Sequence, residues 1–158
     1  MINGSENKVV AEVNGTRKLY FAMVGGLIVF LAVSLAINKL QGPFLKELRF
    51  LNTFLIATFI ISIIALLVAN RLYHNKSLAV INAADTIEKK MEDYRSVLLA
   101  TVAIAEFPAL ISIIGSLITG NYIFLAIAAL VIAFLLKKIP TEKNFIQIVG
   151  TTASSTSF

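Results

Sequence analysis

The sequence predicts an all-α membrane protein: four transmembrane helices as two antiparallel hairpins, with an amphipathic cytoplasmic helix between helices 2 and 3. An apolar composition, four long apolar segments and one substantial polar segment predict it. Of the 158 residues, 58% are hydrophobic and 15% are charged, and the mean hydropathy is +0.84. Soluble domains carry about 25% charged residues. The excess of apolar side chains therefore indicates a lipid bilayer as the solvent.

Four segments approach the length of about 20 apolar residues that a helix needs to cross a bilayer. They are 19–38, 50–70, 96–119 and 122–138, which together make up a transmembrane domain over 19–138. The last segment is the shortest. It spans the bilayer only if Lys137 and Lys138 lay their stems along the helix and reach the surface. Gly120-Asn121 predicts a tight turn between the third and fourth spans.

The basic residues predict the orientation of these spans. Most of the 14 Lys and Arg lie in the N-terminal tail (1–18), the middle polar segment or the C-terminal tail (139–158). The opposite side holds only Lys39, Lys46 and Arg49. Because cytoplasmic loops are rich in Lys and Arg, both termini are predicted to be cytoplasmic. Topology thus accounts for the net charge of +5, and we expect no nucleic-acid partner. The low-complexity end of the C-terminal tail is predicted to be disordered.

The first span also fits a second interpretation. Arg17-Lys18, an apolar run and then Ser34-Leu35-Ala36 resemble a signal peptide with a small-residue cleavage site. The length of the apolar run and of the polar stretch before it favours an uncleaved helix.

The middle segment is predicted to be helical over 78–95. Apolar residues recur there at spacings of three and four, and no Gly or Pro occurs from Leu78 to Phe107, so this helix should continue into the third span. The residues of the stripe are Val80, Ala84, Ile87, Met91 and Tyr94. Two interpretations remain open: a solvated extension packed on its neighbour, or a helix that lies on the membrane surface or docks a partner.

No pattern of residues predicts catalysis. The chain has no Cys and one His, His74, and it lacks a Gly-rich phosphate loop and a pair of carboxylates within one span. We therefore expect no enzymatic activity, no metal and no cofactor.

Glu106 is the residue that calls for explanation, because it falls near the centre of the third span, two residues before Pro108. A charged carboxylate at the bilayer centre costs about 2.5–3.5 kcal/mol, so the neutral acid is the expected form. Pro108 removes a backbone N–H and should kink the helix. Thr58 and Ser62 of the antiparallel second span lie at a similar depth and are the predicted hydrogen-bond partners of Glu106.

Small residues mark the expected positions of close helix packing. They are Gly25 and Gly26 in the first span and Ala103 and Ala109 in the third. Glu106 then has three open roles: a protonated group that hydrogen-bonds helices together, a proton or ion site, or a contact with another subunit.

Two families provide resemblances. Four spans and one membrane carboxylate resemble the double-hairpin proteolipid subunits of rotary ATPases, but those carry dense Gly runs and a Glu in the last span. This chain has 8 Gly, and its Glu is in the third span. Residues 105–143 are more similar to small uncharacterised bacterial four-span proteins. The matching elements are Glu106, Pro108-Ala109, Thr119-Gly120-Asn121 and Pro140-Thr141. That resemblance implies a bacterial inner membrane and this topology, but no activity.

The sequence therefore predicts a non-enzymatic integral membrane protein that is a small subunit or accessory protein of a larger membrane complex. The alternative is a small proton- or ion-coupled transporter or channel that uses Glu106. The expected partners are the bilayer and either other membrane subunits or further copies of the chain.

Overall fold

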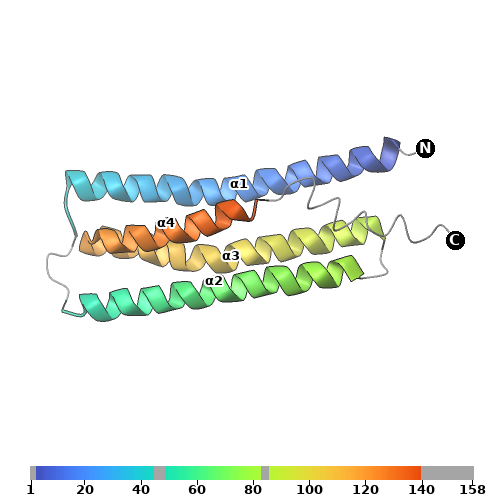
Figure 1. Cartoon of the computed structure of the whole chain (residues 1–158). Helices are drawn as coiled ribbons and strands as arrows, with labels where there is room; N and C mark the ends of the chain where they lie inside the picture. Colours follow the sequence, from blue (N-terminus) through green and yellow to red (C-terminus); the bar gives the residue numbers. More distant parts are fainter. Residues whose placement is uncertain (1–2, 45–48, 83–85, 140–158) are drawn as a thin grey trace.

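The computed structural model describes residues 3–44, 49–82 and 86–139, and these form four helices and no strand (Figure 1). The helices are α1 (Asn3–Leu40), α2 (Leu51–Asn82), α3 (Ile87–Thr119) and α4 (Tyr122–Lys137). The prediction of an all-α fold is confirmed. Most of the predicted C-terminal tail, residues 140–158, lies outside the described residues.

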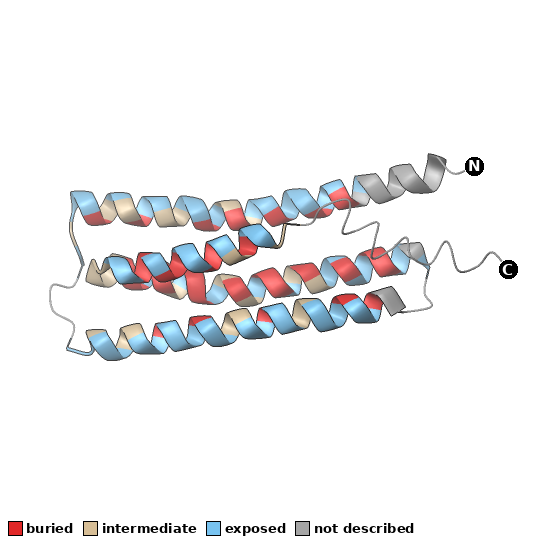
Figure 2. Ribbon diagram, in the orientation of Figure 1, coloured by how far each residue is buried: buried red, intermediate tan, exposed pale blue. Residues whose placement is uncertain are grey.

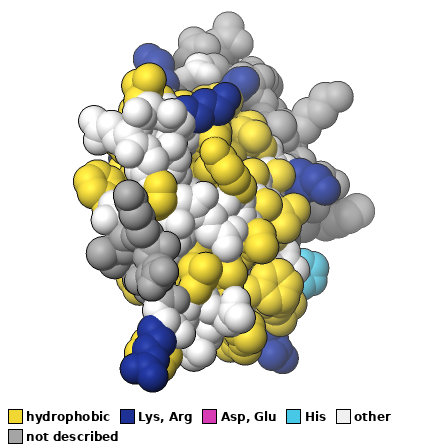
Figure 3. All heavy atoms as spheres, turned by 90° about the vertical axis from the view of Figure 1, so that its left-hand side faces the viewer, with side chains coloured by type: hydrophobic (Ala, Val, Ile, Leu, Met, Phe, Trp, Pro, Cys, Tyr) yellow, Lys and Arg dark blue, Asp and Glu magenta, His cyan; other side chains and the backbone are white. Residues whose placement is uncertain are grey.

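Among the described residues, three helices are long and apolar enough to cross a membrane: α1, α2 and α3. Helix α4 is apolar but has 16 residues. At 1.5 Å per residue it is about 24 Å long, against a hydrocarbon core of about 30 Å. The exposed side chains on the long helices are largely apolar. Figure 3, which looks onto one end of the bundle, also shows mostly apolar side chains with a few Lys and Arg and no visible acidic group. A fourth crossing by α4 stays a prediction.

Helix α3 is the centre of the bundle, because it packs against each of the other three helices (Figures 1 and 2). Helix α4 touches α1, α2 and α3, whereas α1 and α2 run in opposite directions without packing on each other. The first two helices are therefore neighbours in sequence that are held together through α3 and α4. One side of α3 remains exposed, and we call this side the open face of α3. Its residues are Ala103, Phe107, Leu110 and Ile114.

Small side chains form part of the core along α3, beside the larger Leu98, Val102 and Ile113 of the same helix. Ala105, Ala109, Ser112 and Ser116 are each 0% exposed. Small residues let neighbouring backbones approach closely, which is the main source of packing energy between helices in a bilayer. Helices α1 and α4 contribute larger apolar side chains to the same core, and these are Val24, Leu27, Val131 and Leu135.

One turn and a set of hydrogen bonds fix one end of the bundle. Helix α3 ends at Gly120, whose φ of 67° is left-handed, and Asn121 begins α4 by accepting a hydrogen bond from the N–H of Ile123 at 2.9 Å. The predicted turn at Gly120-Asn121 is confirmed. Across the helices, the Asn38 amide donates to the Ser116 carbonyl and hydroxyl oxygens at 3.1 and 2.9 Å.

The prediction of one amphipathic helix over 78–95 was wrong. Helix α2 continues to Asn82, and Thr86 has the extended backbone of an N-cap, so a new helix starts at Ile87. Continuity with the third span holds only from Ile87 onward. Val80 and Met91 of the expected stripe do share one buried cluster, but they reach it from two antiparallel helices.

The segment before the first span is helical as well. Helix α1 begins at Asn3, and in its polar part Val13 and Thr16 are only 2% and 3% exposed. Val13 belongs to the same buried cluster as Val80, Met91 and Tyr94, in which α3 lies between α1 and α2. The part of the predicted N-terminal tail that the structure describes is thus helical. It belongs to a three-helix extension of the bundle built by α1, α2 and α3.

Candidate functional site

Glu106 lies at the boundary between the buried side and the open face of α3. On one side of it, Val102 and Ala109 are buried. On the other side, Ala103 and Phe107 are exposed, and Glu106 itself is partly exposed. An acidic side chain therefore occupies the rim of a surface that is otherwise apolar.

The helix nearest to Glu106 is α1. Ile113 follows Glu106 by seven residues, which is close to two full turns, so the two lie on nearly the same line along α3. The Ile113 carbonyl accepts a hydrogen bond from the Ser34 hydroxyl of α1 at 3.5 Å. Because α1 and α3 run in the same direction, this pairing brings Leu27, which is 3% exposed, level with Glu106. Glu106 thus lies along the seam between α1 and α3.

Helix α2 lies on the other side of α3. Gly115 packs against Phe54 of α2 and Phe124 of α4: a Cβ at Gly115 would lie 3.1 Å from Phe54 Cε1 and 2.9 Å from Phe124 Cδ1. Glu106 precedes Gly115 by nine residues, which is two and a half turns. Two and a half turns reverse the direction of a side chain. Glu106 therefore points away from α2 and α4.

The predicted partners Thr58 and Ser62 are buried at 1% and 3% exposure, but they do not meet Glu106. The Ser62 hydroxyl donates to the Thr58 carbonyl of its own helix at 2.8 Å. The Thr58 hydroxyl is buried and has no hydrogen-bond partner within the described part of the chain. Counting along the antiparallel helices from the Phe54–Gly115 contact brings Ser62 level with Phe107. Ser62 and Glu106 thus lie at similar positions along their helices, but α2 packs on the side of α3 opposite to Glu106.

Within the described residues, no hydrogen bond or ion pair engages the Glu106 carboxyl group. In hydrocarbon an unpaired polar group is unfavourable, and ionisable residues inside spans normally pair with another polar group or face water. No described part of this chain supplies such a partner.

Pro108 lies inside α3, which continues without interruption from Ile87 to Thr119. The proline ring has no N–H, so the carbonyl of Ile104 loses its regular helical donor. The Pro108 carbonyl in turn accepts a second donor, the Ser112 hydroxyl, at 2.7 Å. A buried proline is tolerated here because neighbouring helices and side chains surround the weakened turn.

The predicted close-packing residues have different outcomes. Ala109 is 0% exposed and belongs to the core, whereas Ala103 is exposed on the open face. A Cβ at Gly25 or Gly26 would meet nothing within 4 Å, so no helix approaches closely there. The close approach occurs at Gly115 instead, which the sequence analysis did not single out.

Sequence reasoning also missed a cluster of tyrosines at the C-terminal end of α4. The Tyr20 hydroxyl of α1 donates to the Leu135 carbonyl of α4, and the hydroxyls of Tyr73 and Tyr94 lie 3.3 Å apart. The Lys138 ammonium lies 4.7 Å from the centre of the Tyr73 ring. Tyrosine is enriched at membrane–water boundaries, and that preference could have drawn attention to these residues.

No family model, curated protein or solved structure matches this chain. The arrangement around Glu106 therefore carries the functional argument by itself.

Proposed function

We propose that this chain is a small subunit or accessory protein of a larger membrane complex. A transmembrane helix of an unlike chain docks on the open face of α3 and gives Glu106 its polar partner. The single observation that supports this function is the position of Glu106 at the rim of an exposed apolar face, with no partner in the described chain.

The chemistry of the face favours a helix as the occupant. Phe107 and Ile114 are 61% and 45% exposed and provide apolar contact area. Ala103 is small and exposed, so a neighbouring backbone can approach close to Glu106. A neutral carboxylic acid both donates and accepts hydrogen bonds, and a Ser, Thr, Asn, Gln or basic side chain on the incoming helix satisfies it. Interhelical hydrogen bonds of this kind contribute about 0.6–2 kcal/mol each.

If the chain were a transporter that uses Glu106, this residue would need access to water. A proton or ion site within a span must reach water from both sides of the membrane. A seam between two packed helices, with the rim exposed to lipid, supports a protein–protein contact better than an ion path. Proton uptake by vesicles that contain only this purified chain would favour the alternative.

Site-specific crosslinking tests whether a helix of another chain docks on the open face of α3. The chain has no Cys, so one introduced cysteine can carry a photo-crosslinker at a single position. We place it at Ala103 on the open face and, as the control, at Ala133, an exposed residue of α4. The Phe124–Gly115 contact brings Ala133 level with Glu106 on a different helix, so the two probes sample the same depth.

The expected result is an adduct with an unlike membrane protein from native membranes at position 103 and none with that protein at position 133. Adding Glu106→Leu, which keeps the apolar surface and removes the polar group, should reduce the yield of the adduct at 103, because the lost hydrogen bond contributes about 0.6–2 kcal/mol. An adduct with a second copy of this chain, or one that forms equally well with Leu at position 106, contradicts the proposal.

A further inference from the structure

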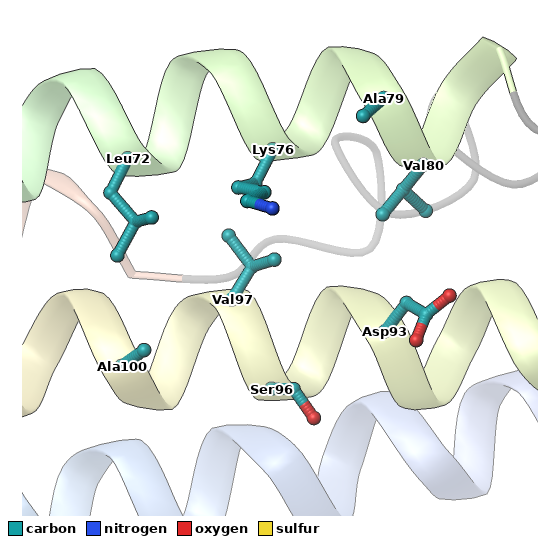
Figure 4. A pocket seen from close by; sticks show the side chains of 8 residues that line it. All are labelled: Leu72, Lys76, Ala79, Val80, Asp93, Ser96, Val97 and Ala100. Carbon is teal, nitrogen blue, oxygen red and sulfur yellow. The ribbon is translucent and has the colours of Figure 1, made fainter.

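A groove between α2 and α3 lies around the ends of the expected spans, with residues of α3 from inside the span and residues of α2 from beyond it (Figure 4). Its volume is about 450 Å³. Helix α2 contributes one wall and α3 the other, and the lining residues are Leu72, Lys76, Ala79, Val80, Asp93, Ser96, Val97 and Ala100. Neither Glu106 nor Ala103 is among them, so this groove is distinct from the open face of α3 near Glu106.

One positive and one negative group face this groove from opposite walls. Lys76 reaches from α2 toward α3, and the Asp93 carboxylate lies on the α3 wall, farther along the groove (Figure 4). Both side chains are exposed, and neither has an ion pair or hydrogen bond with another residue in the described ranges. A ligand that carries an anionic and a cationic group close together satisfies both walls at once.

The groove changes in polarity along its length. The end that lies toward the spans carries no charged group and is lined by Leu72 and Ala100. Lys76 and then Asp93 lie farther along, where Ala79 and Val80 are also part of the wall (Figure 4). The apolar span of α2 was expected to end at residue 70, and that of α3 to begin at residue 96. The groove thus crosses the level at which the hydrocarbon of the bilayer is expected to give way to the headgroup region. A phospholipid has the same order of apolar and charged parts.

We propose that this groove binds a zwitterionic phospholipid whose headgroup carries a primary ammonium, as in phosphatidylethanolamine. Lys76 binds the phosphate, and Asp93 accepts hydrogen bonds from the ammonium. The apolar walls at Leu72, Val97 and Ala100 contact the upper part of the acyl chains. The charge pattern selects the lipid class: an anionic lipid leaves Asp93 without a cation, and a quaternary ammonium has no N–H to donate to it.

Native mass spectrometry of the purified full-length chain tests this headgroup preference. The detergent-solubilised protein is titrated separately with phosphatidylethanolamine, phosphatidylcholine and phosphatidylglycerol of identical acyl chains. We expect phosphatidylethanolamine to bind about tenfold more tightly than phosphatidylcholine, the ratio given by about 1.4 kcal/mol, as one charge-assisted hydrogen bond supplies. Equal affinity for the three lipids overturns the proposal without any variant.

Two substitutions assign the preference to the groove. Asp93→Asn should reduce the ratio of phosphatidylethanolamine to phosphatidylcholine affinity to about one, while Lys76→Gln should weaken both lipids alike. Matched controls remove a charge of the same sign from an exposed position on the same helix outside the groove: Glu92→Gln on α3 and Arg71→Gln on α2. A ratio that survives Asp93→Asn, or falls equally with Glu92→Gln, overturns the assignment.

Discussion

Glu106 and Gly115 point to opposite sides of α3, because the nine residues between them make two and a half helical turns. Gly115 faces the aromatic rings of Phe54 and Phe124, where α2, α3 and α4 meet. Glu106 faces the seam with α1 and the open face. The close packing around Gly115 and the unpaired carboxyl group of Glu106 therefore lie on different sides of one helix, and substitutions at the two positions should act differently.

The first prediction concerns Gly115. A Cβ there would lie 2.9 Å from Phe124 Cδ1 and 3.1 Å from Phe54 Cε1, so Gly115→Ala must displace two packed rings. Overpacking of this kind typically costs about 1–3 kcal/mol. We expect Gly115→Ala to lower the free energy of unfolding by that amount, measured by unfolding of the purified protein in detergent.

The control for this prediction comes from α1. A Cβ at Gly25 or Gly26 meets nothing within 4 Å, and both residues lie inside the helix. Alanine is favoured over glycine in a helix by about 0.5–1 kcal/mol. Gly25→Ala and Gly26→Ala should therefore be neutral or stabilising; a loss of stability equal to that of Gly115→Ala would show that α1 is closely packed there.

The second prediction separates the stability of the isolated chain from its assembly. Glu106 has no partner among the described residues, so Glu106→Gln and Glu106→Leu break no internal hydrogen bond. We expect both variants to keep the free energy of unfolding of the purified chain within about 0.5 kcal/mol. A loss of several kcal/mol in either variant would instead indicate that Glu106 holds the helices of this chain together.

The third prediction concerns the end of α4. The Leu135 carbonyl accepts from the Tyr20 hydroxyl and from the N–H of Lys138, the latter at 2.8 Å. Tyr20→Phe removes one of these two donors and leaves the other, so we expect a destabilisation of about 1 kcal/mol. Tyr122→Phe is the control, because Tyr122 is 56% exposed and should tolerate the change. Equal effects in the two variants would argue against a specific role of the Tyr20 hydroxyl.

The elements that sequence predicted correctly are those that depend on neighbouring residues. The long apolar runs predicted helices α1, α2 and α3, and Gly120-Asn121 predicted the turn before α4, because a left-handed glycine and an N-capping asparagine act locally. The side of α3 on which Glu106 lies depends on which helices pack where. Position along a helix follows from counting residues, but rotation around α3 could not be read from spacing alone.

The prediction of one helix over 78–95 was wrong for a similar reason, because it depended on which helices pack against each other. Val80 and Met91 are spaced as if on one helix face, yet they belong to two helices whose apolar faces meet. Asn82 and Thr86 were available as stop and start signals, since asparagine often ends helices and threonine often begins them. The sequence between α2 and α3 contains no Gly or Pro, so the apolar period runs through it without a visible break. Asn82 and Thr86 are weaker signals of a helix end and a helix start.

The last prediction decides whether α4 crosses the bilayer. The helix has 16 residues, but Lys138 follows it with its ammonium over the Tyr73 ring at 4.7 Å and the Phe134 ring at 5.8 Å. A lysine at the end of a short span lengthens the segment that a bilayer can accept when its ammonium reaches the membrane surface. With four crossings and cytoplasmic termini, reporters fused after residue 45 and at the C-terminus lie on opposite sides of the membrane. If α4 does not cross, the C-terminal reporter lies on the same side as residue 45. A reporter inserted between α2 and α3 serves as a control, because it lies on the side opposite to residue 45 whether or not α4 crosses. We expect the fusion after residue 45 to be external and the C-terminal one cytoplasmic, because most Lys and Arg flank the spans on the side of the termini.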